Sequence, residues 1–298
     1  MLTRGLYYIA TMLGVMVVFG VFVTICVTVF DINLDDAGGY LPLILICLFW
    51  GFAGSIVSLF MSKFMVKKAM RVQVIDTPSS SDEIWLVDTV KRLAAAKGVG
   101  MPEVGIYKSN EMNAFATGWS RNSSLVCVST GLFSSMSRDE CEAVLGHEMS
   151  HVANGDMVTS ALLQGLLNSF VYFFSFIVAS AIAGALSKNS RRGTGGLYYM
   201  IFRMVNSVMH TVFGVAAVMV QMKFSRWREY RADAGSAEVV GADKMISALQ
   251  VLQRGSAVDE NLKSVRAMCI SDPQRAIASL FASHPPLHER IAALKKLK

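Results

Sequence analysis

Two histidines and a glutamate lie within five consecutive residues of this 298-residue chain, in the order His147-Glu148-Met149-Ser150-His151. Residues four apart lie on one face of an α-helix, so both imidazoles can reach a single metal ion, while Glu148 is turned toward a neighbouring face. From there its carboxylate can hold a metal-bound water and act as a general base. This spacing is typical of zinc peptidases.

The residues before the motif predict the helix that it needs. Ser137-Arg138-Asp139-Glu140 has the form of a capping box, in which Ser137 caps the helix and Glu140 reaches back to it. A helix that starts there carries the motif.

Two histidines leave a catalytic zinc site one protein ligand short. A nearby third histidine is excluded, because Asn154 and Met157 stand where the metzincin pattern requires Gly and His. We therefore expect a distant ligand, and Glu229 is the candidate because Asp233 follows it on the same helical face. The alternative is that these two acids, which lie among several arginines, form a solvated ion-pair surface.

The composition indicates a membrane protein, since 53% of the residues are hydrophobic and only 17% are charged. Residues 6–30 and 41–61 are long enough to span a bilayer, and no signal cleavage site follows the first of them. Residues 158–186 and 197–222 are also largely apolar and long enough to span.

The flanking charges predict the orientation. The charged residues of the first loop are all acidic, whereas four basic residues, Lys63, Lys67, Lys68 and Arg71, follow the second span. By the positive-inside rule, the region that carries the histidine motif is cytoplasmic.

The two later apolar segments must cross an even number of times if His151 and Glu229 are to share one metal, which predicts a hairpin. The basic residues of its loop, Lys188, Arg191 and Arg192, conflict with an outside loop, so a re-entrant hairpin stays open as the alternative. Arg203 and His210 of the last segment are costly in lipid, and we expect them to face a protein interior, a cavity or an interface.

Between the membrane segments and the motif the chain becomes soluble in character. A helix is predicted for residues 82–97, ended by Gly98, followed by strands at 104–108, 113–119 and 124–129 that read as an antiparallel meander. The stretch Asn113-Ala114-Phe115-Ala116 is the candidate edge for binding an extended substrate peptide. The alternative is a strand that serves only as scaffold.

The net charge of +6 fits attraction to anionic head groups, and no motif for nucleic-acid binding competes with that interpretation. The five cysteines lack metal-binding spacing, so we expect them to be reduced, buried small hydrophobes.

Several segments together resemble the HtpX family of bacterial inner-membrane zinc endopeptidases, to which type I CAAX prenyl endopeptidases are more distantly related. They are residues 147–156, Asn113-Ala114-Phe115-Ala116-Thr117-Gly118, the Glu229 to Asp233 segment and Ser283-His284-Pro285-Pro286. The resemblance implies a gluzincin core and one Zn²⁺ per chain, bound by His147, His151 and Glu229. It further implies that Glu148 is the base, that Asp233 supports a ligand, and that the family's work in membrane-protein quality control involves an ATP-dependent membrane protease.

Matched residue by residue, the family's His-Pro motif makes His284 and Arg290 candidates for stabilising the oxyanion or positioning the substrate. The alternative is that they belong to a C-terminal helix cap.

We therefore predict a membrane α+β protein with four apolar helices, two N-terminal spans and a helical hairpin, and a mainly helical zincin domain that carries a small antiparallel meander. The expected parts are residues 1–65 (two spans), 66–157 (first zincin half), 158–222 (hairpin) and 223–298 (second zincin half). The expected activity is cleavage of flexible cytoplasmic segments of misfolded or damaged proteins in the bacterial inner membrane, and the chain has no phosphate-binding loop for ATP-driven unfolding. The alternative is a catalytically silent, zinc-stabilised membrane scaffold that binds such clients.

Overall fold

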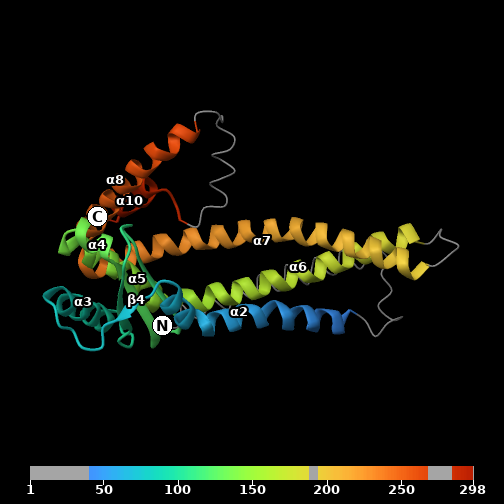
Figure 1. Ribbon diagram of the computed structural model, residues 1–298, viewed down its shortest axis with the longest axis horizontal. Coiled ribbons are helices and arrows are strands. Elements are labelled where there is room, and N and C mark those ends of the chain that lie inside the picture. Colours follow the sequence, from blue (N-terminus) through green and yellow to red (C-terminus); the bar gives the residue numbers. More distant parts are fainter. Residues whose placement is uncertain (1–39, 188–193, 268–283, 298) are drawn as a thin grey trace. The chain divides into compact units, whose positions relative to one another are not determined.

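The computed structural model describes residues 40–187, 194–267 and 284–297, and it is mainly helical with one small sheet (Figure 1). The membrane-type helices are α2 (Leu41–Ala69), α6 (Asp156–Ser187) and α7 (Thr194–Val240). The remaining elements are β1 (Gln73–Val74), α3 (Ser81–Lys97), β2 (Glu103–Tyr107), β3 (Ala114–Ser120), β4 (Ser123–Ser129), α4 (Thr130–Ser135), α5 (Arg138–Asn154), α8 (Ala242–Ala267) and α10 (Leu287–Lys295).

Three helices, α2, α6 and α7, are long and apolar enough to cross a membrane. They coincide with three of the four apolar helices predicted from the sequence, and the fourth, at residues 6–30, lies outside the described residues. Helix α7 does not stop at residue 222, where the apolar segment was expected to end, but continues to Val240. The segment with Glu229 and Asp233 is therefore a direct extension of a membrane-type helix.

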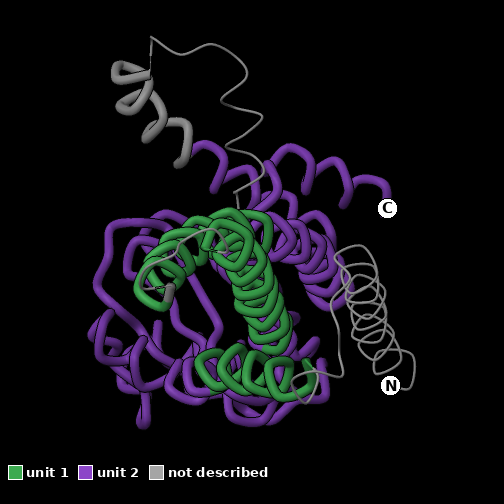
Figure 2. The backbone as a smooth tube through the Cα atoms, turned by 90° about the vertical axis from the view of Figure 1, so that its right-hand side faces the viewer, with its two compact units in different colours: residues 1–56, 162–217 green, residues 57–161, 218–298 purple. Residues whose placement is uncertain are grey.

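The chain divides into two compact units, drawn in different colours in Figure 2. The first comprises residues 1–56 and 162–217, and the second residues 57–161 and 218–298. Each of the long helices α2, α6 and α7 contributes residues to both units.

Within the first unit, small residues allow α2 and α6 to pack closely. A Cβ atom on Gly51 would lie 2.1 Å from the Ser169 hydroxyl, and one on Gly165 would lie 2.7 Å from the Ser55 hydroxyl. Such pairs of small residues are typical of helices packed in membranes. Arg203 and His210 are exposed on α7, so the first of the three expected surroundings, a protein interior, is wrong, while a place at a cavity or an interface stays a prediction.

The sheet of the second unit is mixed, with the strand order β1-β2-β4-β3. The predicted strands are present, but the antiparallel meander is wrong: β4 lies between β2 and β3, parallel to β2 and antiparallel to β3. The physical reason is the run Leu125-Val126-Cys127-Val128, which is fully buried and so suits a central strand covered on both faces. A short strand not expected from the sequence, β1, pairs antiparallel with β2.

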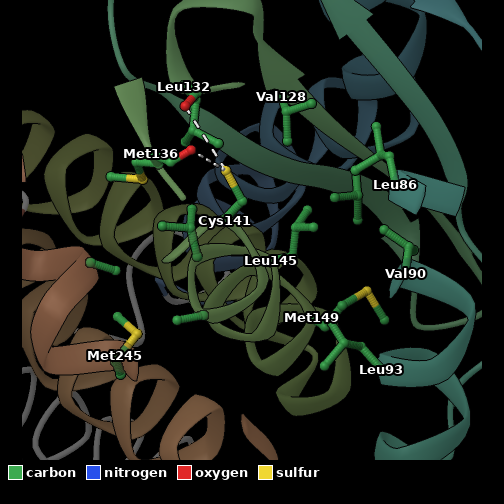
Figure 3. Close-up of a cluster of buried hydrophobic side chains, with 14 of the residues drawn as sticks. Leu86, Val90, Leu93, Val128, Leu132, Met136, Cys141, Leu145, Met149 and Met245 are labelled. Carbon is green, nitrogen blue, oxygen red and sulfur yellow. Dashed lines mark hydrogen bonds between the residues drawn. The ribbon is translucent and has the colours of Figure 1, made fainter. Parts of the chain in front are cut away.

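The main core joins one face of the sheet to the helices (Figure 3). Val128 of β4 packs in the same cluster as Leu86 and Leu93 of α3 and Leu145 and Met149 of α5. Helices α8 and α10 add to this cluster, so α5 is enclosed by apolar side chains. Replacing one of these leucines by alanine would lower the free energy of unfolding by roughly 2–5 kcal/mol. This packing therefore holds the helix that carries the histidine motif in place.

The opposite face of the sheet has its own small apolar cluster. Tyr107, Leu125 and Cys127 are buried there, and Phe115 of β3 packs against them together with Met70, which follows α2. Burial raises the pKa of the Cys127 thiol to about 12, and Cys47, Cys127 and Cys141 are free and buried, as predicted. Cys26 and Cys269 lie outside the described residues.

Candidate active site

Helix α5 begins where its sequence predicts. Ser137 and Glu140 form the expected capping box, and Gly155 ends the helix in the left-handed conformation with φ of 72°. His147 and His151 lie one turn apart, with their ring centroids 4.7 Å apart and nearly perpendicular. Their Nε2 atoms face each other at 3.1 Å.

Glu229 of α7 supplies a third donor group next to this pair. One carboxylate oxygen lies 3.3 Å from Nε2 of His151 and the other 3.6 Å from Nε2 of His147. Donor atoms of the three residues all lie within 4.8 Å of one another, which suits a shared metal ion. The structure thus brings the three predicted ligands together, although Glu229 follows His151 by 78 positions in the sequence.

Glycine allows α7 to approach α5 closely enough for this contact. A Cβ atom on Gly146 would lie 2.7 Å from the Ser236 hydroxyl, and one on Gly235 would lie 2.6 Å from the Ser150 hydroxyl. Ser236 also donates a hydrogen bond of 2.7 Å to the carbonyl oxygen of Ala143. These contacts set the distance between the helix with two histidines and the helix with Glu229.

Asp233 lies at Nδ1 of His147, whereas Nε2 of the same ring faces the donor cluster. Its Oδ1 is 2.8 Å from Nδ1 of His147, so the ring keeps its proton on Nδ1 and presents a lone pair at Nε2. Arg290 of α10 holds the same carboxylate, with Nε 2.8 Å from Oδ2 and Nη2 2.6 Å from Oδ1. All three side chains are buried.

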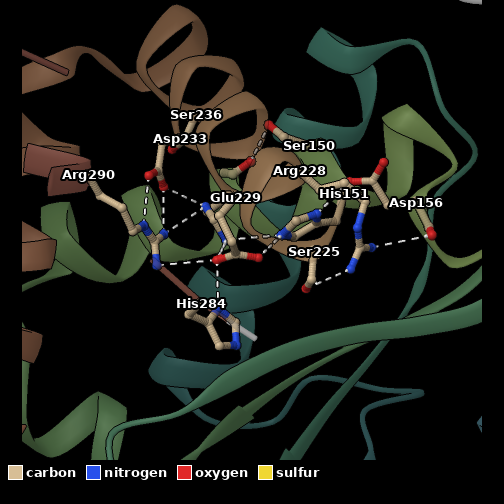
Figure 4. Close-up of polar contacts among 12 residues, drawn as sticks. Ser150, His151, Asp156, Ser225, Arg228, Glu229, Asp233, Ser236, His284 and Arg290 are labelled. Carbon is tan, nitrogen blue, oxygen red and sulfur yellow. Dashed lines mark hydrogen bonds and ion pairs between the residues drawn. The ribbon is translucent and has the colours of Figure 1, made fainter. Parts of the chain in front are cut away.

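Asp156 plays the matching part behind His151, with Oδ2 2.6 Å from Nδ1 of that ring. Asp156 was not among the predicted site residues. The signal for it was its place directly after Gly155, five residues after His151. Arg228 of α7 donates to the backbone oxygen of Asp156 at 3.4 Å (Figure 4), so α7 also contacts the start of α6.

The charges of the site favour a bound cation. Asp156, Glu229 and Asp233 are each at most 3% exposed, and Arg290 is the one buried arginine near them in the described part of the chain. Buried charge without a counter-charge is strongly destabilising, so a divalent cation among these acids would offset it. Two nitrogen donors and one carboxylate suit zinc. In each histidine, a carboxylate that accepts the Nδ1 proton leaves Nε2 free to bind the metal.

The pKa values show the same attraction for positive charge. Burial lowers the pKa of His151, but hydrogen bonds with Asp156 and Glu229 outweigh burial and raise that pKa to about 10. Burial raises the pKa of Glu229, but its contacts with His147, His151 and His284 outweigh burial and hold the pKa well below its usual range. The surrounding carboxylates favour either a proton or a metal ion on the ring nitrogens, and the two compete for the same lone pairs.

Glu148 is half-buried on α5 between the two histidines. Its carboxylate makes no hydrogen bond to another described residue, which leaves it available to a water molecule or a substrate. His284 is exposed and places Nδ1 2.7 Å from Oε2 of Glu229. Of the two residues taken from the His-Pro motif, therefore, His284 lies at the open side of the cluster and Arg290 lies within it.

The stretch Asn113 to Ala116 comprises the residue before β3 and the first three residues of that strand, which lies at the edge of the sheet. Helix α5 packs against β3, so this edge lies beside the helix with the histidines. No hydrogen bond joins the four residues to the donor cluster within the described part of the chain, and substrate binding by this edge stays a prediction.

Comparison with known proteins identifies the family. The model of "Peptidase family M48" matches residues 80–298. "Protease HtpX" of Aeromonas hydrophila subsp. hydrophila is 50% identical over 98% of this chain and 99% of its own length. The corresponding proteins of Tolumonas auensis and Xanthomonas campestris pv. campestris are each 47% identical over 99% of this chain and 99% and 98% of their own lengths.

Among solved structures, S. mikatae Ste24p has a similar fold, with a TM-score of 0.61 over 93% of this chain and 67% of that chain. Their sequences are 21% identical, so this likeness concerns the fold alone. With a family match over residues 80–298 and relatives that are half identical along nearly their whole length, this chain belongs to peptidase family M48.

Proposed function

We propose that this chain is a zinc-dependent membrane endopeptidase that cuts flexible cytoplasmic segments of misfolded or damaged membrane proteins. The observation that carries the proposal is the donor cluster of His147, His151 and Glu229 beside Glu148, in a chain of family M48 whose described residues include three membrane-type helices. The relatives from Aeromonas hydrophila and Tolumonas auensis are both named as proteases, which supports the same activity.

In this proposal His147, His151 and Glu229 hold one Zn²⁺, while Asp233 and Asp156 orient the two rings. When bound, zinc supplies a Lewis acid that polarises the peptide carbonyl and makes water more acidic. Glu148 takes the proton from the attacking water and delivers it to the leaving amine. General acid–base catalysis of this kind typically contributes about 100-fold to 10,000-fold to the rate.

The two residues of the His-Pro motif receive different roles. His284 is exposed beside Glu229, so its ring can reach a substrate oxygen on which negative charge develops. The guanidinium of Arg290 is engaged by Asp233 and lies 3.3 Å from Glu229, so it positions the ligands rather than the substrate.

The proposed location is the bacterial inner membrane, with residues 1–65 and 158–222 as membrane parts and residues 66–157 and 223–298 as the catalytic part in the cytoplasm. The basic residues after the apolar part of α2 support that orientation. Without a phosphate-binding loop, the enzyme depends on segments that are already unfolded or on an ATP-dependent membrane protease as partner. A reporter fused within residues 188–196 distinguishes a two-crossing hairpin, with a periplasmic signal, from a re-entrant one, with a cytoplasmic signal.

The deciding experiment compares wild type with Glu148→Gln, both stripped of metal in detergent, reloaded with zinc and mixed with an unfolded model protein. We expect the variant to bind one equivalent of zinc and to lose at least about 100-fold in cleavage rate. Asp88→Asn, an exposed change on α3, is the matched control and should cleave like wild type. Equal cleavage by wild type and Glu148→Gln would point to a contaminating protease. Absence of cleavage with both proteins would favour the catalytically silent scaffold that only binds its clients. The scaffold alternative has no support from the comparisons.

A further inference from the structure

Trp119, at the far end of β3 from Asn113, is a large apolar side chain that the fold leaves exposed. It is 44% exposed, and its ring centroid lies 5.8 Å from that of Phe60 on α2, which is 58% exposed. Both residues belong to the second unit. Exposed aromatic side chains in contact with each other indicate a surface that binds a membrane or another molecule.

The length of α2 indicates where Phe60 lies along the membrane normal. At 1.5 Å per residue, the hydrocarbon core of about 30 Å takes roughly 20 residues, which counted from Leu41 end at Phe60. The first charged residue of the helix is Lys63. Phe60 is therefore at the boundary between hydrocarbon and head groups, and so is the tryptophan that contacts it.

Two further sets of contacts hold the sheet at this level. Lys63 binds Glu103 of β2 at 2.8 Å, and Lys67 binds the other oxygen of the same carboxylate. Burial raises the pKa of Glu103, but the two lysines outweigh burial and lower it, so the carboxylate stays charged. On the same side of the sheet, Phe115 packs with Met70, directly after α2.

The chemistry of this surface suits phospholipid. Tryptophan concentrates in the interfacial region, where its ring is apolar and its N–H meets polar groups. Phe64 and Met65 continue the exposed apolar surface next to Phe60, and the exposed Lys68 follows with a positive charge for anionic head groups. This surface is continuous with the membrane-spanning part of α2, so no separate protein partner is needed to cover it.

We propose that Trp119 and Phe60 insert into the interfacial region of the bilayer and hold strand β3 at the membrane surface. Combined with the proposed function, on which this second step rests, an edge strand at that height pairs with a substrate segment just after it leaves the bilayer. The enzyme then selects cleavage sites next to transmembrane helices over equivalent sites farther along the same chain.

The insertion is tested by fluorescence, because the chain has only four tryptophans. Single-tryptophan variants that keep Trp119, Trp85 or Trp50 are placed in phosphatidylcholine–phosphatidylglycerol vesicles with bromine either near the head groups or near the bilayer centre. We expect bromine near the head groups to remove about half of the Trp119 emission, and central bromine to remove less. Trp50, within the apolar part of α2, should show the opposite order, and Trp85, which packs against Phe133 in the core, should respond to neither.

If the single-tryptophan protein does not fold, the difference in emission between wild type and Trp119→Phe gives the same information. A Trp119 signal as insensitive to both lipids as that of Trp85 overturns the proposal.

The selectivity is tested with one segment offered in two forms, as a free peptide and tethered to a transmembrane helix in the same vesicle as the enzyme. Trp119→Ala should cut the free peptide as fast as wild type, and its cleavage rate at the tethered sites nearest the bilayer should fall about tenfold. Trp119→Tyr should keep the wild-type rate for both forms of the segment. Unchanged cleavage positions in Trp119→Ala overturn the selectivity. Failure of wild type to cut even the free peptide would instead reject the proposed function.

Discussion

Arg290 donates two hydrogen bonds to Asp233, of 2.8 and 2.6 Å, and both side chains are buried. The same carboxylate faces the ring of His147. A residue near the end of the chain thus fixes the orientation of a histidine 143 positions earlier in the sequence.

Arg290→Met should destabilise the fold by about 3–5 kcal/mol, because it leaves Asp233 charged and buried without its partner. Thermal unfolding in detergent measures this loss. The double variant Arg290→Met with Asp233→Asn should recover part of it, since the unpaired charge is gone. An Arg290→Met protein that unfolds at the wild-type temperature would contradict the assignment of this pair.

Asp156→Ala should weaken zinc binding by about 10-fold to 100-fold, because His151 loses the acceptor that holds its proton on Nδ1. Competition with a chelator of known affinity measures the change without relying on activity. Asp76→Asn, at an exposed position, is the control and should bind zinc like wild type. Wild-type affinity in Asp156→Ala would show that the rest of the site orients His151 on its own.

Gly146→Ala should push α7 away from α5, since the new methyl group would lie 2.7 Å from the Ser236 hydroxyl. We expect zinc affinity to fall by about tenfold or more, because Glu229 moves away from the histidines. Adding Ser236→Ala removes the clashing oxygen and should restore most of the affinity. Gly214→Ala, on α7 with no atom within 4 Å of the added carbon, should have no effect. A loss that Ser236→Ala does not rescue would exclude helix spacing as the cause.

Glu142 of α5 binds Lys244 of α8 at 2.8 Å and Arg92 of α3 at 2.6 Å. Burial raises its pKa, but these two partners outweigh burial and lower it below the ordinary value of 4.5. Its stabilisation is therefore present above pH 4.5 and is lost as the pH falls through the folded-state pKa. Glu142→Gln should cost about 1–2 kcal/mol at neutral pH and progressively less in acid.

The thermal midpoints of wild type and Glu142→Gln, measured from pH 7 down to pH 3, should therefore converge. Asp88→Asn, exposed on α3, should leave the midpoints unchanged at every pH. A constant difference between wild type and Glu142→Gln over this range would mean that the carboxylate acts through its shape rather than its charge.

Local signals in the sequence predicted the elements of the site well. Ser137 caps the start of α5 as predicted, and the four-residue spacing of His147 and His151 places both rings on one face. Helix bounds and ligand spacing depend on neighbours within one or two turns, which a sequence displays directly.

Relationships between distant elements were harder to predict. The place of β4 between β2 and β3 depends on which strand is buried on both faces, and strand order along the chain does not reveal it. The role of Asp156 depends on the turn at Gly155, after which the Asp156 carboxylate lies at Nδ1 of His151. Both outcomes come from packing rather than from local preference.

One residue, Gly155, separates α5 from α6, and α7 runs without interruption from its apolar part to Glu229. Asp156, whose carboxylate contacts His151, is the first residue of α6, and Glu229, the third metal-binding candidate, belongs to α7. The catalytic part therefore shares the helices α6 and α7 with the membrane part. A fragment trimmed for solubility keeps the site only if it retains Asp156 at the start of α6 and the part of α7 that carries Glu229.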